Sequence, residues 1–364
     1  MLNAERPVIL LGEGARGADL GAILALGVPV LTSWQAADLI DSDHPMNFGR
    51  PGLYGQRCAN RMLFEADFVL SLGCRLSIWM VGYEGLRDNQ ALTIVDIDQL
   101  ELDRFPQARR VCSTVAQFLP EIVAPGSWGL EPWIDQCNGW RRQYPWIESP
   151  AHDDPPSYLS PYRVMERLQP RLKPDQIIVT DMGTALVCAF QTLRLKPPQR
   201  LMTSGGLGEM GCALPAAIGA SFSRDKGEVL CLNCDGGMML NLQELQTVAH
   251  HRLPIKIIVF SNDGYVMIKH TQKGAGMAYS GVNEASGVSC PDFMAVARAF
   301  GIAAAQVWTR EDLDKALPWA MGTPGPALVE IFIDPEQKLV PKLDPIYRNG
   351  LATSPAFWDL SPHL

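Results

Sequence analysis

The sequence predicts an α/β protein with two doubly wound, parallel-sheet domains, and three observations point to this class. Short apolar runs of strand length alternate with helical stretches, which indicates parallel strands joined by right-handed crossovers. The alternation occurs twice, on either side of a stretch rich in proline, tryptophan and charge at residues 125–158. The 364 residues also fit about two domains of roughly 150 residues each.

The first predicted domain covers residues 1–124 and is Rossmann-like. Its strands are expected at residues 8–11, 28–32, 68–72 and 93–96, and one of its helices at residues 56–65. A glycine-rich turn, Gly12 to Gly17, follows the first strand and leads into a helix.

Residues 125–158 are predicted to be a linker that contains a helix near residues 132–144. The second domain, residues 159–335, has its strands expected at 176–180, 228–233, 255–261 and 327–333. Residues 336–364 are rich in proline and aromatic residues and are predicted to form an ordered C-terminal arm.

The composition narrows the classes of function. Hydrophobic residues make up 47% and charged residues 19% of the chain, which favours sizeable cores over disorder. The net charge of −8 disfavours nucleic acid or an anionic membrane as a partner. No apolar stretch approaches the roughly 20 residues that a membrane span requires. The nine cysteines follow no disulfide or zinc pattern, which is typical of a cytoplasmic protein with reduced thiols.

The most informative motif follows the strand at residues 228–233. Asp235, Gly236 and Gly237 end this strand, and a helix begins almost at once. Such a turn presents backbone N–H groups to an anion such as a diphosphate, and the carboxylate can share Mg²⁺ with it. Asn262 ends the next strand, 27 residues later, so it returns to the same sheet edge. The alternative is an ordinary βαβ turn with a solvated aspartate.

These residues resemble the signature of thiamine diphosphate (ThDP) enzymes, a Gly-Asp-Gly followed after a fixed interval by Asn-Asn. The resemblance implies bound ThDP and Mg²⁺, with Asp235, Asn262 and the carbonyl of Gly264 as metal ligands. It places Gly236, Gly237 and Asn262 at the cofactor. Cys234 replaces the first glycine and Ser261 the first asparagine, and neither is a ligand position.

Residues 202–220 resemble the segment around the aminopyrimidine ring in acetolactate synthases. The resemblance implies that Met210 is the apolar wedge that bends ThDP and that the Gly208 carbonyl lies near its amino group. The alternative is a glycine-rich helix packed on a sheet, with the methionine in the core. By the same resemblance, Gly183 and Thr184 contact the diphosphate, and Tyr265, Met267 and Lys269 edge the substrate pocket.

The first domain resembles the central domain of acetolactate synthases, which holds FAD. The matching surfaces are Gly12, Gly14 and Gly17, then Gly52 and Gly55, and the pair Asp96 and Asp98. Many relatives keep this scaffold without a flavin, and the sequence after Arg75 departs from the usual charged run. FAD therefore stays an open alternative to a purely structural domain.

The resemblance implies a subunit of an acetolactate-synthase-like carboligase that decarboxylates a 2-oxo acid, with pyruvate favoured, and transfers a two-carbon acyl unit. The tail, residues 354–362, resembles proteins of sugar pathways and hints at a keto sugar as acceptor. The family's catalytic glutamate belongs to an N-terminal pyrimidine-binding domain that these residues do not contain. We therefore expect it from a separate chain in a hetero-oligomer.

Three alternatives remain: a non-catalytic cofactor-binding or regulatory subunit, a simple 2-oxo-acid decarboxylase, and a nucleotide-binding oxidoreductase. The last has little support because no strict GxGxxG precedes a helix with an acidic residue about 20 positions later.

Overall fold

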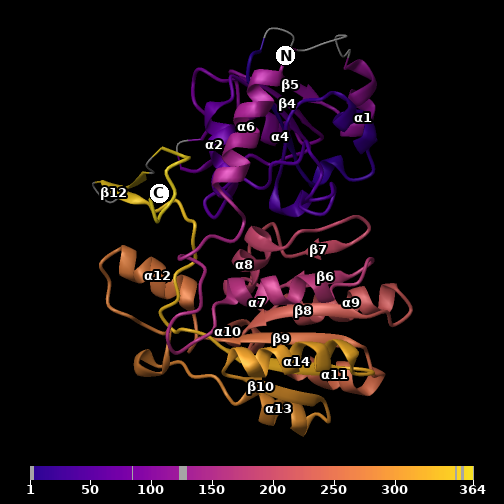
Figure 1. Ribbon diagram of the computed structural model, residues 1–364, viewed down its shortest axis with the longest axis vertical. Helices are drawn as coiled ribbons and strands as arrows, with labels where there is room; N and C mark the ends of the chain where they lie inside the picture. The colour runs from indigo at the N-terminus through magenta and orange to yellow at the C-terminus, as the bar shows by residue number, and fades with distance from the viewer. Residues whose placement is uncertain (1–3, 84, 123–128, 349–350, 354–355, 364) are drawn as a thin grey trace. The chain divides into compact units, whose positions relative to one another are not determined.

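The computed structural model describes residues 4–83, 85–122, 129–348, 351–353 and 356–363, which form two compact units. Unit 1 comprises Met1–Glu148, Arg194–Pro197 and Val340–Leu364, and unit 2 comprises Ser149–Leu193 and Pro198–Leu339. Each unit has its own parallel sheet, flanked by helices (Figure 1). The predicted fold class, two parallel-sheet α/β domains, is confirmed.

The sheet of unit 1 has five strands in the order β2-β1-β3-β4-β5, all parallel. Alternate residues of its central strands enter opposite cores: Val8 and Leu10 lie in one hydrophobic cluster, Ile9 and Leu11 in the other. Burial on both faces explains why these central strands are largely apolar. The strands are β1 (Pro7–Leu11), β2 (Val30–Thr32), β3 (Phe68–Leu72), β4 (Ala91–Asp96) and β5 (Arg109–Cys112).

Helices cover both faces of this sheet. The helix α6, expected inside the linker, packs through Trp133 and Cys137 into the core of unit 1. The helices of unit 1 are α1 (Leu20–Ala25), α2 (Arg57–Glu65), α3 (Ile78–Val81), α4 (Gln99–Asp103), α5 (Val115–Phe118) and α6 (Glu131–Gln143).

The end of the chain is bound to unit 1 by a buried arginine. Arg57 pairs with Glu148 at 2.9 Å and donates to the carbonyl oxygens of Leu360 and Pro362, each at 2.7 Å. Loss of these partners would leave the buried guanidinium group of Arg57 unpaired, which is strongly destabilising. The last part of the predicted arm therefore folds as part of unit 1. A short hairpin, β12 (Ile346–Arg348) and β13 (Leu351–Thr353), precedes it.

The sheet of unit 2 has six parallel strands in the order β10-β11-β9-β8-β6-β7. Its central strands β8 and β9 are buried along their whole length. The strands are β6 (Ile177–Thr180), β7 (Arg200–Met202), β8 (Val229–Cys234), β9 (Ile255–Ser261), β10 (Ala303–Val307) and β11 (Ala327–Phe332).

The strand order reverses direction between β6 and β8. From β6 the chain moves outward to β7, then returns to the other side for β8 and β9. In open α/β sheets, ligands bind outside the carboxyl ends of the strands at such a switch point. The topology therefore selects the ends of β6, β8 and β9 as the candidate site.

Eight helices are described for unit 2. They are α7 (Pro161–Leu168), α8 (Thr184–Thr192), α9 (Ala213–Ser223), α10 (Asp235–Met238), α11 (Leu245–His251), α12 (Val266–Gly274), α13 (Phe293–Ala299) and α14 (Arg310–Gly322). Within the described ranges, none of the helices has the length and apolar character needed to cross a membrane.

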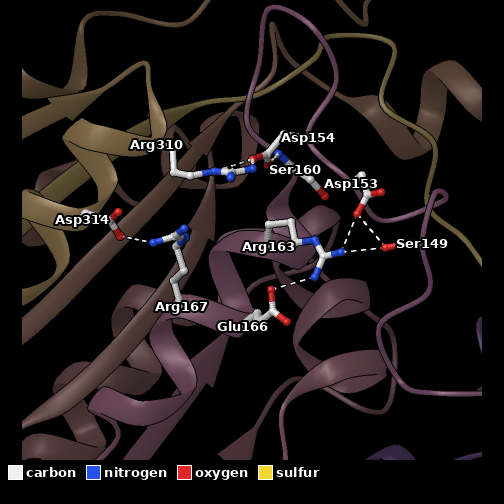
Figure 2. Close-up of polar contacts among 9 residues, drawn as sticks. All are labelled: Ser149, Asp153, Asp154, Ser160, Arg163, Glu166, Arg167, Arg310 and Asp314. Atoms are coloured by element: carbon white, nitrogen blue, oxygen red, sulfur yellow. Dashed lines mark hydrogen bonds and ion pairs between the residues drawn. The ribbon is translucent and has the colours of Figure 1, made fainter.

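Arginine–carboxylate contacts fix the first residues of unit 2 to two of its helices (Figure 2). Asp154 pairs with Arg310 of α14, and its other oxygen accepts the N–H of Ser160 at 2.8 Å, just before α7. Figure 2 also shows Arg163 of α7 between Asp153 and Glu166. This network ties the segment before α7 to both α7 and α14.

Candidate functional site

Asp235 is the first residue of α10, at the carboxyl end of β8, and its side chain is buried. Its Oδ2 accepts the N–H groups of Asn262 at 2.8 Å and Gly264 at 3.0 Å, and its Oδ1 accepts that of Gly236 at 2.8 Å. Burial raises the pKa of Asp235 to about 6, although these N–H groups and Lys269 act to lower it. A cation bound at this carboxylate would favour its charged form.

Three polar groups meet at the Asn262 side chain. One atom of its amide lies 3.1 Å from the carbonyl oxygen of Gly264 and 3.2 Å from Oδ1 of Asp235, and the other lies 3.2 Å from Oγ1 of Thr184. Because the two amide atoms are assigned from their contacts, the first atom is either a nitrogen that donates to both oxygens or an oxygen. In the second case three oxygens converge, an arrangement that a bound cation would stabilise. Neighbouring ligands of an octahedral Mg²⁺ lie about 3 Å apart, which matches this spacing.

The glycines of the turn are required by packing. A Cβ on Gly236 would lie 2.2 Å from the ring of Tyr265, and one on Gly237 would lie 1.8 Å from Oδ2 of Asp181. Tyr265 and Met267 lie at the start of α12 and are half-buried. Both glycines thus let the chain pack tightly around the end of β8. Their N–H groups lie in the first turn of the short helix α10.

The segment Gly183–Thr184 lies beside this loop. Gly183 has a φ of 110° and precedes α8, whose first residue Thr184 bonds the Asn262 amide. Sγ of Cys234 accepts the N–H of Ala185 at 3.4 Å. The cysteine that replaces the usual glycine therefore occupies the space beneath the start of α8. Its buried thiol has a raised pKa, chiefly because of desolvation.

The second departure from the motif, Ser261, is directed toward β11. Its hydroxyl donates to Oε1 of Glu330 at 2.8 Å, and Oε2 of that carboxylate accepts from Gln306 at 3.1 Å. Ser261 thus has a packing role next to the loop, and its hydroxyl is engaged with the neighbouring strand.

Asp181 is a site residue that sequence reasoning did not single out. It follows β6 directly, is fully buried, and accepts the N–H groups of Gly211 at 3.0 Å and Cys212 at 3.1 Å. Burial raises the pKa of Asp181, and the donated N–H groups partly offset this. The sequence did contain a signal for Asp181, because it follows a predicted strand and the carboxyl ends of parallel strands meet at one sheet edge.

Met210 lies in a turn that is clamped on one side. It is flanked by Gly208 with a φ of 66° and Gly211 with a φ of 84°. The N–H of Gly211 binds Asp181, and its carbonyl oxygen accepts from Nδ2 of Asn241 at 2.7 Å. Met210 is half-buried, so it is not absorbed into the core as the alternative interpretation required.

Lys269 is expected from the sequence to edge a substrate pocket. It is buried, and its Nζ donates to the carbonyl oxygens of Asn262 and Pro335, each at 3.2 Å. The same loop packs tightly at Gly264, whose φ is 103° and whose added Cβ would lie 2.3 Å from the Val282 carbonyl oxygen. Lys269 therefore supports the loop from behind.

Most of the glycines predicted to face FAD in unit 1 are likewise required by packing, whereas Gly17 has open space around an added Cβ and is favoured by its φ of 87°. An added Cβ would lie 2.0 Å from the Gly73 carbonyl oxygen at Gly12, 2.4 Å from the Trp79 carbonyl oxygen at Gly52, and 2.3 Å from Oδ1 of Asn60 at Gly55. The need for glycine at these positions follows from contacts within the chain. It gives no support to a flavin.

Two family models match the chain. Residues 181–331 match the model described as thiamine pyrophosphate enzyme, C-terminal TPP binding domain, and residues 1–122 match thiamine pyrophosphate enzyme, central domain. Thiamine pyrophosphate is another name for ThDP. The first match begins directly after β6 and covers the other strands of the unit 2 sheet except the last residue of β11, and the second covers the whole sheet of unit 1. Neither description mentions a flavin.

Several curated relatives are named acetolactate synthase large subunits. The isozyme 1 large subunit of Escherichia coli (strain K12) is 32% identical over 358 residues, which cover 95% of this chain and 62% of that protein. The probable large subunit of Methanococcus aeolicus is 29% identical, with 93% and 59% covered. The E. coli isozyme 2 large subunit is 27% identical, with 96% and 64% covered. The chain thus spans about three-fifths of the length of these relatives.

Proposed function

Because this chain belongs to the thiamine pyrophosphate enzymes and carries their central and C-terminal domains, we propose that unit 2 holds Mg²⁺ and the diphosphate of ThDP in an acetolactate-synthase-like carboligase. The observation that carries this proposal is the meeting of Asp235, Asn262 and the Gly264 carbonyl at the sheet's switch point. One carboxylate and two neutral oxygens form a donor set that suits Mg²⁺, which keeps its remaining positions for water and phosphate oxygens.

Each predicted residue then has a defined task. Asp235, Asn262 and Gly264 hold the cation, while Gly236, whose N–H is bonded to Asp235, the N–H of Gly237 and the Gly183–Thr184 turn lie next to the diphosphate. Met210, clamped through Gly211, supports the bent form of the cofactor. When bound, ThDP supplies an electron sink for decarboxylation of a 2-oxo acid. We propose pyruvate as the 2-oxo acid and a ketone, such as a keto sugar, as the acceptor of the two-carbon acyl unit.

The proposed metal ligands are tested by two aspartate-to-asparagine substitutions in the two neighbouring loops of the site. Asp235→Asn removes the buried carboxylate at the site, whereas Asp263→Asn removes an exposed carboxylate from the adjacent loop. We expect Mg²⁺-dependent retention of ThDP, followed by equilibrium dialysis, to fall at least about tenfold for Asp235→Asn, as for other lost metal-site interactions. Asp263→Asn should retain the cofactor normally. Equal retention by both variants would remove Asp235 from the ligand set.

We further propose that the pyrimidine half of the cofactor is held by a domain on a separate chain, which supplies the catalytic glutamate. The relatives are longer than the span that they share with this chain, so experiment has to locate the part that holds the pyrimidine ring. Native mass spectrometry of the complex purified from its own host should find a smaller partner in fixed stoichiometry, together with ThDP and Mg²⁺. An active species in which the pyrimidine domain belongs to the same polypeptide would overturn this arrangement. A loaded complex that turns over no 2-oxo acid would favour the non-catalytic alternative.

A further inference from the structure

Two buried lysines lie near opposite ends of β9 in unit 2. Lys256, near its start, donates to the carbonyl oxygens of Thr323 and Gly325. Lys269, on the helix that follows its end, donates to the carbonyl oxygens of Asn262 and Pro335. Each side chain is only 1% exposed. A buried ammonium group is unfavourable unless its environment supplies acceptors or negative charge.

The surroundings of Lys269 include the proposed cation site. The carbonyl that it binds belongs to Asn262, whose N–H donates to Asp235 and whose side chain faces the Gly264 carbonyl. The proposed ligand set contains one carboxylate and two neutral oxygens, so a single negative charge there already faces the positive charge of Lys269. Of the neighbouring carboxylates, Asp181 is bound by the N–H groups of Gly211 and Cys212, and Asp263 is exposed to solvent. The buried Glu330 accepts from the Ser261 hydroxyl and the Gln306 amide.

We propose that Lys269 is a positioning residue that acts as a resident positive charge behind the cation loop and makes cation binding depend on the diphosphate. This inference rests on the proposed function. A divalent cation that enters alone would leave an excess of buried positive charge next to Lys269, which is strongly disfavoured in a low-dielectric site. A diphosphate brings the missing negative charge. The loop is thus held in shape before the ligands arrive, but is balanced in charge only when both are present.

The test measures Mn²⁺, as a probe for the divalent cation, retained by the full chain in equilibrium dialysis, because diphosphate also binds the free ion in solution. Titrations are run with Mn²⁺ alone and with inorganic diphosphate. For the wild type we expect diphosphate to tighten Mn²⁺ binding by about 100-fold or more, equivalent to two steps of about 1.4 kcal/mol. For Lys269→Met we expect Mn²⁺ alone to bind about tenfold tighter than in the wild type, one such step, with a smaller gain from diphosphate.

Two controls separate charge from structural support. Lys256→Met removes an equally buried lysine that also binds two carbonyl groups, at the other end of the same strand, and should leave Mn²⁺ binding unchanged. Lys269→Arg keeps the charge and should behave like the wild type. If Lys269→Met does not unfold cooperatively, Lys269→Gln replaces it, because glutamine keeps an N–H donor without the charge.

The outcomes distinguish this inference from the proposed function. The role of Lys269 would be overturned if Lys269→Met bound Mn²⁺ no more tightly than the wild type. It would also be overturned if Lys256→Met changed Mn²⁺ binding by the same amount. Tight binding of Mn²⁺ alone to the wild type would overturn it without any variant. Absence of diphosphate-dependent Mn²⁺ binding in the wild type would overturn the proposed function itself.

Discussion

Gly237 illustrates how little free space lies under the proposed diphosphate turn. An added Cβ would come within 1.8 Å of Oδ2 of Asp181 and 3.0 Å of Oδ1 of Asn233. Asp181 cannot move aside freely, because it is bonded to two backbone N–H groups. We expect Gly237→Ala to lower the free energy of unfolding by about 1–3 kcal/mol, the usual penalty of overpacking. Denaturant unfolding measures this.

The matched control for that variant lies in α6 of unit 1. A Cβ on Gly139 would meet nothing within 4 Å, and alanine is a better helix former than glycine. Gly139→Ala should therefore raise the free energy of unfolding, by up to about 1 kcal/mol. A Gly237→Ala protein as stable as the wild type would show that the turn can relax around the added methyl group.

The buried carboxylate of Asp181 makes stability depend on pH. Burial raises its pKa in the folded protein above the ordinary value of 3.8. Between the two pKa values the folded state binds more protons than the unfolded state, so stability decreases as pH rises through that window and stays lower above it. Asp181→Asn lacks this group, so the difference in unfolding free energy, wild type minus variant, should decrease from pH 4 to pH 7. A difference that grows with pH would contradict the direction of the shift.

The sequence located some site residues and not others, for a physical reason. Asp235, Asn262 and Gly264 follow strands whose ends must meet at one edge, so their proximity follows from the topology. The roles of Asp181 and Lys269 depend on which way a buried side chain points, and that is decided by packing around it. For Lys269 nothing in the sequence indicated this burial, because the ammonium group turns inward to two carbonyl oxygens, and its place at a pocket edge stays a prediction.

At the scale of elements, the central strands were predicted and most edge strands were not. β1, β3, β4, β6, β8, β9 and β11 all have predicted counterparts, and each has neighbours on both sides. The strands β5, β7 and β10 were missed, and each is an edge strand. An edge strand such as β5 is partly exposed and lacks a continuous apolar run. Its apolar signal is therefore weak, whereas a strand buried on both faces is unmistakably apolar.

The contacts before α7 allow the hydrogen bond of Asp154 to the backbone to be tested separately from its ion pair (Figure 2). Asp154 accepts the N–H of Ser160 and also pairs with Arg310, which is largely exposed. Asp154→Ala should lower the free energy of unfolding by about 1 kcal/mol, because the start of α7 loses a hydrogen bond to a charged group. Arg310→Ala removes the pair alone and should lower it by no more than a few tenths to about 1 kcal/mol.

Urea unfolding at low and high salt distinguishes these contributions. The effect of Arg310→Ala should shrink in high salt, since exposed ion pairs are screened, whereas that of Asp154→Ala should largely persist. Equal effects of the two variants at both salt concentrations would indicate that Asp154 acts only through its arginine.

For the whole molecule, the division into two compact units predicts that ligands stabilise them unequally. The proposed ligands contact residues of unit 2, whose core and sheet are its own. In differential scanning calorimetry, Mg²⁺ with ThDP should therefore raise the midpoint of one transition and leave the other in place. At 100 times the dissociation constant the gain is about 2.7 kcal/mol, which for a unit of this size corresponds to a rise of roughly 5–10 °C.

The assignment of the shifted transition comes from variants placed in each unit. Asp235→Asn should reduce the ligand-induced rise by half or more, whereas Gly139→Ala should raise the other midpoint with or without ligand. Because binding to the folded state stabilises only the cooperative block that contains the site, two transitions that rise together would mean that the units unfold as a single block. A rise confined to the transition that responds to Gly139→Ala would instead place the ligands in unit 1, against the proposed site at Asp235.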